Sequence, residues 1–590
     1  DEAARRDIAA QADSVQLMGG MQLIEEGDSS ESFYLVMGGR IRTFVTKDDG
    51  REHQTGEVGR GELVGETAVL TGEPQPESAR AIRDSDLLQF SKEAFYQLVE
   101  SHPKAVLVIS KNIAIRYQRE VHGINADSAI STIAIIPAGH GASISDFTNR
   151  LVASLSKIGT TVHLDVKSVE NALSQGSTDG SEEDSILQWL HEQEARFQFV
   201  IYESTSEFSS WSRRCIRQAD LILSVGTAGD APDLNSIEKE IASQQNNQVI
   251  ARQELVLLHP NRDKLPSGTG KWLDLRNLAN HHHIVFDNTD DYKRLCRFLT
   301  GNAISLVLGG GGARGCAHIG LIRALQELHV PIDTIGGTSI GSALSGFFAL
   351  GLNSYEILAK IDKLYVERPL KDYTLPLVSL ITGRRLNKAL QKMYGDIQIE
   401  DLWVNYFSVS ANLTRAQTEI HKQGSVWKCV RASMSIPGHI PPMVFNGELH
   451  VDGGVLNNLP VDKMREICDG IIIANNVSPR VELKVTGSNE GTYSGWDYML
   501  NALKPSSKKL QMPSIVNILM RSGTLYSIKQ ISVSKAMADI YMSPPIEKFQ
   551  LLDFGSSHEI EEVGYKYALE VMNSQLHDNE LLKKALLYVK

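Results

Sequence analysis

Gly-Gly-Gly-Gly-Ala-Arg-Gly, residues 309–315, directly follows the apolar segment Ile304–Leu308, and Gly-Thr-Ser-Ile-Gly, residues 337–341, comes next along the chain. The segment before the glycine run is typical of a buried β-strand, and a helix is predicted to begin near Ala317. The second motif lies between another apolar segment and a helix-like segment, residues 343–350. Two strand–turn–helix units in succession predict an α/β fold for this part of the chain.

The serine of the second motif has the setting that a nucleophile requires. A nucleophilic serine stands on a sharp strand-to-helix turn, and glycines two residues before and after it keep side chains out of that turn. We therefore predict that Ser339 is a nucleophile on an elbow formed with Gly337 and Gly341.

The glycine run is predicted to form an oxyanion hole. Its backbone N–H groups lie at the start of a predicted helix, where they can closely approach a developing negative charge. The predicted hole comprises Gly310, Gly311, Gly312, Arg314 and Gly315. A nucleotide-phosphate loop or a simple tight connection is the alternative interpretation of this run.

A candidate general base lies at Asp452. Val-Asp-Gly-Gly, residues 451–454, ends the strand-like segment Glu448–Val451, and the two glycines leave the carboxylate with little steric cover. In that position it could accept the Ser339 proton. An ordinary Asx turn is the alternative.

Together these motifs resemble a known family. Gly-Gly-Gly-x-Arg-Gly, then Gly-x-Ser-x-Gly, then Asp-Gly-Gly is similar to the patatin-like phospholipases, and more closely to the neuropathy target esterase subgroup. Further similar stretches are Leu299–Asn302, Ile399–Trp403, Val430–Ser435 and the proline-rich Ile436–Pro442. The resemblance implies a patatin-like α/β hydrolase domain over residues 301–590, with a core at about 304–477 and a C-terminal helical extension. It also implies a Ser339–Asp452 dyad that requires no histidine, metal or cofactor.

A triad that contains histidine is the competing mechanism. In α/β-hydrolases the chain order is Ser, acid, His. Three histidines near the acid precede it, and only two follow it: His421, His439 and His450, then His558 and His577. This order favours the dyad.

The N-terminal region resembles a cyclic nucleotide-binding β-roll. Residues 20–90 contain strand-like segments separated by glycine-containing turns at 26–28, 38–40 and 61–66, and residues 92–120 are predicted to be the closing helices. The resemblance implies that Gly65 and Glu66 meet the ribose, and that an arginine about ten residues later pairs with the phosphate. Gln75 occupies that position, so the charge-assisted contact is absent. We predict a regulatory or docking domain, residues 1–122, in which Gly65, Glu66 and Gln75 form a degenerate pocket that binds cyclic nucleotides weakly or not at all.

The middle region, residues 128–298, is predicted to be a doubly wound, Rossmann-like α/β domain. Apolar strand candidates alternate with segments long enough for crossover helices: Thr132–Ile136, Phe199–Tyr202, Leu221–Val225, Glu254–Leu258 and His283–Phe286. Ser267–Lys271 resembles part of a nucleotide-binding loop but lacks its first glycine and its final hydroxyl residue. Three consecutive histidines, residues 281–283, alternate in direction along a strand, so a partly exposed strand edge is favoured over a metal site.

Composition agrees with a multidomain globular protein. The 590 residues allow three or four domains, and 42% hydrophobic with 22% charged residues is typical of globular chains. The net charge of −12 argues against nucleic acid as a partner. Five scattered cysteines indicate a reducing, cytoplasmic compartment: Cys215, Cys296, Cys316, Cys429 and Cys468. No apolar run is long enough to span a bilayer. The sequence begins with Asp1 rather than Met, and animal members of the resembled family carry an N-terminal membrane anchor. Two alternatives therefore stay open, a full-length protein with an anchor ahead of Asp1 and one without it.

Two segments are candidates for peripheral contact with a membrane surface. Tyr373–Ile381 is apolar, and residues 512–526 are apolar with Lys504, Lys508, Lys509 and Arg521 nearby. Core helices are the alternative for both. The polar residues 481–496 read as a surface loop.

The predicted activity is that of a carboxylic ester hydrolase acting on phospholipid or lysophospholipid substrates. Preference for lysophospholipids follows from the family resemblance alone. The alternatives are a broader acyl hydrolase acting on diacyl phospholipids or neutral glycerides, and a non-enzymatic, cyclic-nucleotide-responsive scaffold.

Overall fold

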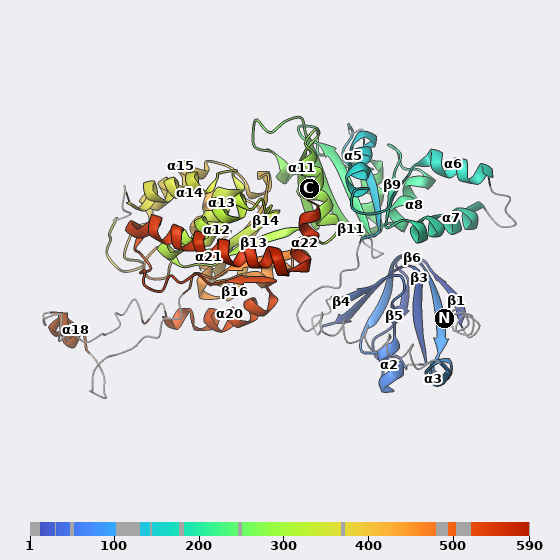
Figure 1. Ribbon diagram of the computed structural model, residues 1–590, viewed down its shortest axis with the longest axis horizontal. Coiled ribbons are helices and arrows are strands. Elements are labelled where there is room, and N and C mark those ends of the chain that lie inside the picture. Colours follow the sequence, from blue (N-terminus) through green and yellow to red (C-terminus); the bar gives the residue numbers. More distant parts are fainter. Residues whose placement is uncertain are drawn as a thin grey trace. The chain divides into compact units, whose positions relative to one another are not determined.

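The computed structural model describes residues 12–29, 31–47, 52–101, 130–141, 144–175, 182–245, 251–366, 372–478, 494–502, 518 and 521–588. The chain forms two compact units. The first comprises Asp1–Ala303, Ile467–Gly470 and Lys584–Lys590, and the second comprises Ile304–Glu466 and Ile471–Lys583. Figure 1 shows the elements of each unit. The predicted end of the N-terminal helical region, residues 102–120, lies outside the described residues.

The N-terminal region is an antiparallel β-roll with strand order β1-β6-β3-β4, drawn in blue in Figure 1. Its strands are β1 (Asp13–Leu17), β2 (Gln22–Ile24), β3 (Ser32–Thr46), β4 (Glu52–Val58), β5 (Leu63–Val64) and β6 (Ser78–Ser91), with helices α2 (Glu66–Thr71) and α3 (Lys92–Ser101). Side chains on one face of each strand point into the roll, and Val36, Ile41 and Leu87 are among the apolar residues buried there. The predicted β-roll is confirmed.

One predicted turn of this domain is wrong. Residues 38–40 continue β3, and the pairing of β3 with β6 shifts register there. Gly39 has φ 91°, and an added Cβ would lie 2.2 Å from the Ser85 hydroxyl oxygen. Glycine within a strand often marks a bulge, and here the bulge bends one long strand instead of ending it.

The middle region is a six-stranded parallel sheet with order β12-β11-β10-β7-β9-β8. Its strands are β7 (Thr132–Pro137), β8 (Thr161–Leu164), β9 (Phe199–Glu203), β10 (Leu221–Thr227), β11 (Arg252–His259) and β12 (Asn280–Val285). Its helices are α5 (Ser145–Leu155), α6 (Val166–Gln175), α7 (Glu182–Arg196), α8 (Ser210–Gln218), α9 (Ser236–Gln245), α10 (Thr269–Leu273) and α11 (Thr289–Leu299). The doubly wound α/β prediction is confirmed.

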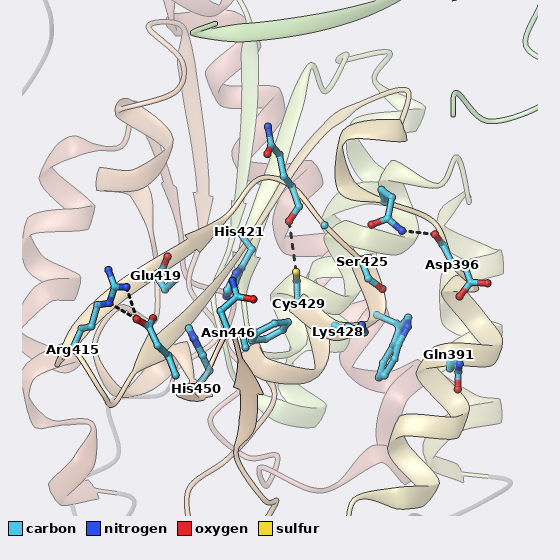
Figure 2. Close-up of a pocket in the computed structure, with 16 residues that line it drawn as sticks. Gln391, Asp396, Arg415, Glu419, His421, Ser425, Lys428, Cys429, Asn446 and His450 are labelled. Carbon is cyan, nitrogen blue, oxygen red and sulfur yellow. Dashed lines mark hydrogen bonds and ion pairs between the residues drawn. The ribbon is translucent and has the colours of Figure 1, made fainter. Parts of the chain in front are cut away.

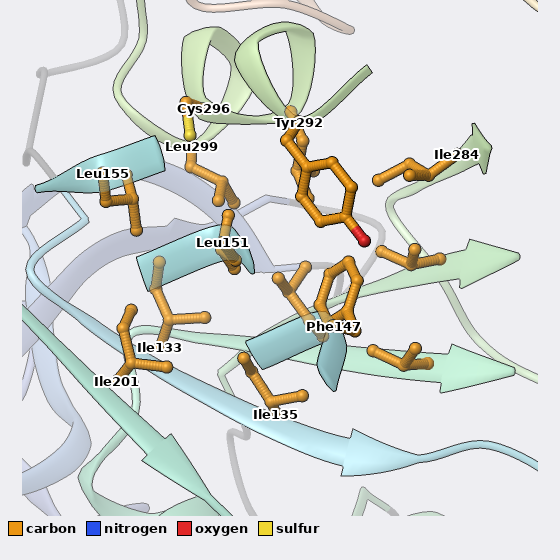
Figure 3. Close-up of a cluster of buried hydrophobic side chains, with 14 of the residues drawn as sticks. Ile133, Ile135, Phe147, Leu151, Leu155, Ile201, Ile284, Tyr292, Cys296 and Leu299 are labelled. Atoms are coloured by element: carbon orange, nitrogen blue, oxygen red, sulfur yellow. The ribbon is translucent and has the colours of Figure 1, made fainter. Parts of the chain in front are cut away.

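Helices α5 and α11 cover one face of this sheet. Figure 3 shows Phe147 and Leu151 of α5 and Tyr292 of α11 packed against Ile133 and Ile135 of β7. All five side chains are at most 2% exposed. Burial of such side chains is the main stabilising contribution to this layer.

The histidine run lies on β12, which is the predicted edge strand, but two of its side chains are buried. His282 and His283 are each 2% exposed. The His282 Nε2 atom lies 2.7 Å from Glu254 Oε2, and the His283 Nδ1 atom lies 3.0 Å from His259 Nε2. The expected partial exposure is therefore wrong for these two residues. The ring of His282 packs against Phe298 of the covering helix α11, and the ring of His283 contacts His259.

The second unit is built on an eight-stranded mixed sheet with order β17-β18-β15-β14-β13-β19-β20, and β16 pairs with β15. The strands are β13 (Ile304–Leu308), β14 (Thr334–Thr338), β15 (Asn405–Asn412), β16 (Gln417–His421), β17 (Met443–Phe445), β18 (Glu448–Asp452), β19 (Ile471–Asn475) and β20 (Ile540–Met542). The helices include α12 (Cys316–Glu327), α13 (Ile340–Ala349), α14 (Ser354–Ile361), α15 (Arg384–Tyr394), α16 (Val426–Ser433), α17 (Val461–Arg465), α18 (Gly495–Ala502), α20 (Leu525–Met537), α21 (Ser557–Asp578) and α22 (Glu580–Leu587). Helix α22 begins in this unit and continues into Lys584–Lys590, which belong to the first unit.

Strand order and register bring the predicted motifs together. The glycine run follows β13 and Ser339 follows the neighbouring parallel strand β14, so both turns lie at the same edge of the sheet. Thr338 pairs with Val409 of β15, and the next β15 residue, Ser410, pairs with Asp452 of β18. Asp452 therefore lies level with Ser339, although 113 residues separate them in the sequence.

Candidate active site

Ser339 stands on a strained turn between β14 and α13. Its backbone has φ 57° and ψ −124°, a conformation that non-glycine residues adopt at a cost of about 1–3 kcal/mol. An added Cβ on Gly337 or Gly341 would lie 2.2 Å from the Leu308 carbonyl oxygen. The turn therefore presses against the end of β13, and only glycine fits at both positions. This is the geometry of a nucleophile elbow.

The Ser339 hydroxyl donates a hydrogen bond to Asp452. The distance from Oγ to Oδ2 is 2.6 Å, and the Gly454 N–H donates to Asp452 Oδ1 at 2.8 Å. Burial raises the pKa of the Asp452 carboxyl to about 6, although both hydrogen bonds favour the carboxylate. The group is therefore ionised at neutral pH and can accept a proton from Ser339.

The glycine run lies directly against the elbow. An added Cβ on Gly310 would lie 3.1 Å from the Ser339 Cβ and 2.4 Å from Asn458 Oδ1. The Gly310 N–H, however, donates to the Asn458 carbonyl oxygen at 3.1 Å. This contact conflicts with the predicted role of the Gly310 amide as an oxyanion donor, and the amides of Gly311 and Gly312 are the next candidates.

The other two predicted members of the hole have packing roles in this structure. The Arg314 Nε donates to the Phe549 carbonyl oxygen at 2.8 Å, which ties the run to the segment after β20. Gly315 lies against α13, since an added Cβ would be 2.5 Å from Ile340 Cγ2. These contacts hold the glycine run close to α13, the helix that begins directly after Ser339.

Two residues that support the site were missed from the sequence. His318 is completely buried, its Nε2 lies 2.8 Å from the Gly309 carbonyl oxygen, and its Nδ1 lies 2.9 Å from Asn475 Nδ2. Burial lowers the pKa of His318 to about 4, so the ring is neutral. Because Asn475 Nδ2 is a donor, we assign the ring proton to Nε2, which donates to Gly309.

Asn458 holds the opposite side of the glycine run. Its Nδ2 donates to the Gly310 carbonyl oxygen at 3.0 Å, and its own carbonyl accepts from the Gly310 N–H. Asn458 lies six residues after Asp452, so one short segment supplies both the hydrogen-bond partner of Ser339 and a contact that holds the glycine run.

The histidines that a triad would need lie elsewhere. His421 Nε2 and His450 Nδ1 lie 2.8 and 3.0 Å from the Ser410 hydroxyl oxygen and line a separate cavity of about 860 Å³, shown in Figure 2. His558 Nε2 lies 2.8 Å from Asp362 Oδ2, and His577 Nδ1 lies 2.7 Å from Asp578 Oδ1. Within the described residues, no histidine has a hydrogen bond to Ser339 or Asp452.

In the β-roll, the structure brings together the three residues predicted for the degenerate pocket. Gly65 has φ 82° and is followed by the buried Glu66, and an added Cβ on Gly65 would lie 3.3 Å from Gln75 Nε2. The nearest downstream arginine in the sequence, Arg80, lies on β6, where its Nη2 is 3.0 Å from Glu52 Oε1. Arg80 is thus already paired on the sheet and does not replace the missing phosphate contact.

We expect this β-roll to bind cAMP and cGMP more weakly than the micromolar range. The reason is that Gln75 supplies no charge for the cyclic phosphate. Titration calorimetry of the whole chain with each nucleotide checks the expectation, with a cyclic-nucleotide-binding kinase subunit as the positive control. Saturable micromolar binding to the wild-type chain would contradict it.

Among the residues that the structure describes, no group of three or more His, Cys, Asp or Glu side chains could hold a metal ion. The described helices likewise include none that is both long and apolar enough to cross a bilayer.

Family comparisons agree with the fold. Residues 306–465 match the family described as patatin-like phospholipase, residues 129–300 match the neuropathy target esterase family P-loop like domain, and residues 15–102 match the cyclic nucleotide-binding domain. The second unit therefore contains a patatin-like hydrolase domain. The three matches together show a cyclic nucleotide-binding domain, a neuropathy target esterase family P-loop like domain and a patatin-like phospholipase domain, in that order along the chain.

Three relatives illustrate the similarity. Patatin-like phospholipase domain-containing protein 7 of Rattus norvegicus is 33% identical over 95% of this chain and 45% of its own length. Neuropathy target esterase sws of Drosophila melanogaster is 32% identical over 95% of this chain and 42% of its own length. Lysophospholipase nte1 of Aspergillus fumigatus is 32% identical over 96% of this chain and 42% of its own length. The chain therefore spans less than half the length of these relatives.

Proposed function

We propose that this chain is a serine esterase that hydrolyses the fatty acyl ester of lysoglycerophospholipids. The observation that carries the proposal is the 2.6 Å hydrogen bond from Ser339 Oγ to Asp452 Oδ2 at the strained elbow, beside the glycine run. A hydroxyl paired with a buried carboxylate, next to backbone N–H groups at a helix start, supplies the nucleophile, base and electrostatic stabilisation that acyl transfer needs.

The proposed reaction has two halves. Ser339 Oγ attacks the acyl carbonyl carbon while its proton passes to Asp452 Oδ2, and the amides of Gly311 and Gly312 stabilise the resulting oxyanion. The intermediate collapses, the glycerol oxygen leaves with the proton from Asp452, and an acyl-enzyme ester remains. Water then attacks this ester, with Asp452 again accepting the proton, and fatty acid leaves as Ser339 recovers its proton.

The substrate class comes from the relatives and is part of the proposal. The two fungal relatives are named lysophospholipases, and the family model names phospholipase. We infer that the substrate is a lysophospholipid presented at a membrane surface, with the enzyme bound peripherally on the cytoplasmic side. All five cysteines are buried and free, in keeping with a reducing compartment.

We expect the kcat/KM of the chain for lysophosphatidylcholine to be at least about tenfold higher than its kcat/KM for diacyl phosphatidylcholine. Fatty-acid release from both substrates, in matched mixed micelles, measures the ratio. A fluorophosphonate probe should also modify Ser339, and peptide mass spectrometry locates the adduct.

Each alternative predicts a different result. Equal or faster hydrolysis of the diacyl lipid, or of a neutral glyceride, would indicate a broader acyl hydrolase. A chain that neither releases fatty acid nor reacts with the probe would favour the non-enzymatic scaffold.

A further inference from the structure

A loop of the second unit exposes a cluster of apolar side chains. This loop, residues 372–382, is called the apolar loop below. Tyr373, Leu375, Leu377 and Val378 are 71%, 78%, 89% and 70% exposed. Sequence patterning allowed a core helix here, but the structure contains an open loop with its apolar side chains in solvent. Leu380, in contrast, is only partly exposed.

The apolar loop is held in one conformation by its own polar groups. Its two ends meet through the Thr382 N–H, which donates to the Asp372 carbonyl oxygen at 2.8 Å, and through the Thr382 hydroxyl, which donates to Asp372 Oδ2 at 2.5 Å. The Thr374 N–H donates to the Leu380 carbonyl oxygen at 3.1 Å. A preformed loop loses little conformational freedom when its apolar side chains are covered.

The base of the apolar loop is attached to the segment that positions Asp452. The Leu380 N–H donates to the Gly438 carbonyl oxygen at 3.0 Å. Gly438 lies three residues after Ser435, whose carbonyl oxygen accepts the Asp452 N–H at 2.9 Å. The apolar loop is therefore connected to the backbone of Asp452 through residues 435–438.

A buried arginine fixes this attachment. Arg431 is 1% exposed, and its Nη1 donates to the Ser435 hydroxyl at 2.6 Å while its Nη2 donates to the Pro441 carbonyl oxygen at 3.0 Å. Its Nε donates to Asn387 Oδ1 at 2.7 Å, in the helix that follows the apolar loop. The guanidinium thus joins α15, the end of α16 and the segment before β17 into one support.

Positive charge follows the apolar loop directly. Arg384, Arg385 and Lys388 are exposed in the first turns of α15, which begins two residues after Thr382. Apolar side chains bordered by cations suit the boundary between lipid headgroups and acyl chains, where anionic lipids attract the cations. A single loop tip is small compared with the roughly 800 Å² per partner that specific protein interfaces bury.

We propose that the apolar loop inserts into an anionic phospholipid bilayer and holds the candidate active site at the lipid surface. This inference rests on the proposed function for its purpose, since a lipid esterase has to reach substrate in a membrane. Membrane insertion itself is measured without turnover.

The test compares Leu377→Asp with Leu413→Asp, a matched apolar-to-acidic change at a site that is 50% exposed in the same unit. Each protein is sedimented with vesicles of phosphatidylcholine and phosphatidylserine. We expect the loop variant to bind at least about tenfold more weakly than the wild type, because each buried apolar side chain contributes roughly a factor of ten or more to partitioning. Leu413→Asp should bind like the wild type, and omission of phosphatidylserine should weaken wild-type binding.

Activity separates this inference from the proposed function. Hydrolysis is measured on lysophospholipid in vesicles and on a water-soluble short-chain aryl ester. The vesicle-to-soluble activity ratio should fall at least about tenfold in the loop variant and stay constant in Leu413→Asp. Unchanged vesicle binding by the loop variant overturns the inference. If the wild type is a dimer and the loop variant is a monomer that still binds vesicles, the loop is a dimer interface and the inference is also overturned. A wild type that binds vesicles through the loop but hydrolyses neither ester would instead contradict only the proposed function.

Discussion

Replacing Ser339 by alanine is expected to lower kcat/KM for lysophosphatidylcholine by about 10⁴-fold or more. Removal of a catalytic nucleophile leaves only the contribution of substrate binding and oxyanion stabilisation, and effects of this size are usual for such changes. The substitution removes one hydroxyl whose partner is Asp452 Oδ2. Alanine at a position with φ 57° keeps the same backbone strain as serine, so the fold should be retained.

A serine within α13, the helix that follows Ser339, provides the control. Ser345 is buried in α13, and its hydroxyl has no hydrogen-bond partner among the described residues. Ser345→Ala should therefore keep wild-type turnover and fluorophosphonate labelling, whereas Ser339→Ala should lose both. Turnover that survives Ser339→Ala would refute the proposed nucleophile, and equal losses in both variants would indicate a packing effect of α13.

The pairing of Ser339 with Asp452 could be predicted because each residue stands in a local glycine-containing motif. Gly337 and Gly341 are both required because the turn presses against the Leu308 carbonyl oxygen, and the glycines after Asp452 belong to the turn that presents the carboxylate. The sequence order of strand, glycine run, helix, strand and elbow also identifies two neighbouring parallel strands. A local pattern is enough when the residues that a turn requires lie within a few positions of one another.

His318 and Asn458 leave no such signature. His318 acts through Gly309, nine residues earlier, and through Asn475 on β19, 157 residues later. Asn458 acts through Gly310, 148 residues earlier. These contacts exist only after β13 and β19 have paired, so a histidine on an apolar helix face and an asparagine in a loop look ordinary in the sequence. The engagement of the Gly310 amide by Asn458 was unpredictable for the same reason.

The errors in the fold have a similar cause. Strand β8 is absent from the predicted strands. It is four residues long and only its last residue is buried, so its pattern of apolar residues is too short to detect. Gly39 is predicted to lie in a turn because glycine favours turns, but its neighbours pair with β6, Gly38 with Asp86 and Arg40 with Arg83, which are far away in the sequence. The exposure of the apolar loop likewise depends on hydrogen bonds to residues 438 and 439, which hydropathy alone does not reveal.

Asp452→Asn is expected to lower kcat/KM by about 10²- to 10⁴-fold, the usual contribution of a general base. In the wild type, the pKa of about 6 predicts that kcat/KM falls as the pH drops below about 6, since the protonated carboxyl cannot accept the Ser339 proton. The variant should lack this acidic limb. Glu448→Gln, a matched change at the start of the same strand, should keep both the rate and the limb. An acidic limb that persists in Asp452→Asn would assign the titration to another group.

Urea unfolding checks that Asp452→Asn remains folded. The buried Asp452 carboxylate lowers the free energy of unfolding of the wild type, and asparagine removes that charge. Its folded pKa of about 6 is raised above the ordinary value of 3.8, so the group stabilises the fold only when protonated, and this contribution is lost as the pH rises through about 6. The difference corresponds to about 3 kcal/mol of destabilisation at pH 8. Asp452→Asn should therefore unfold at higher urea than the wild type at pH 8 and at nearly the same urea below pH 4. A variant that is less stable at pH 8 would mean that the carboxylate is better solvated than the structure indicates, and that its loss of activity reflects disruption of the turn at Gly453.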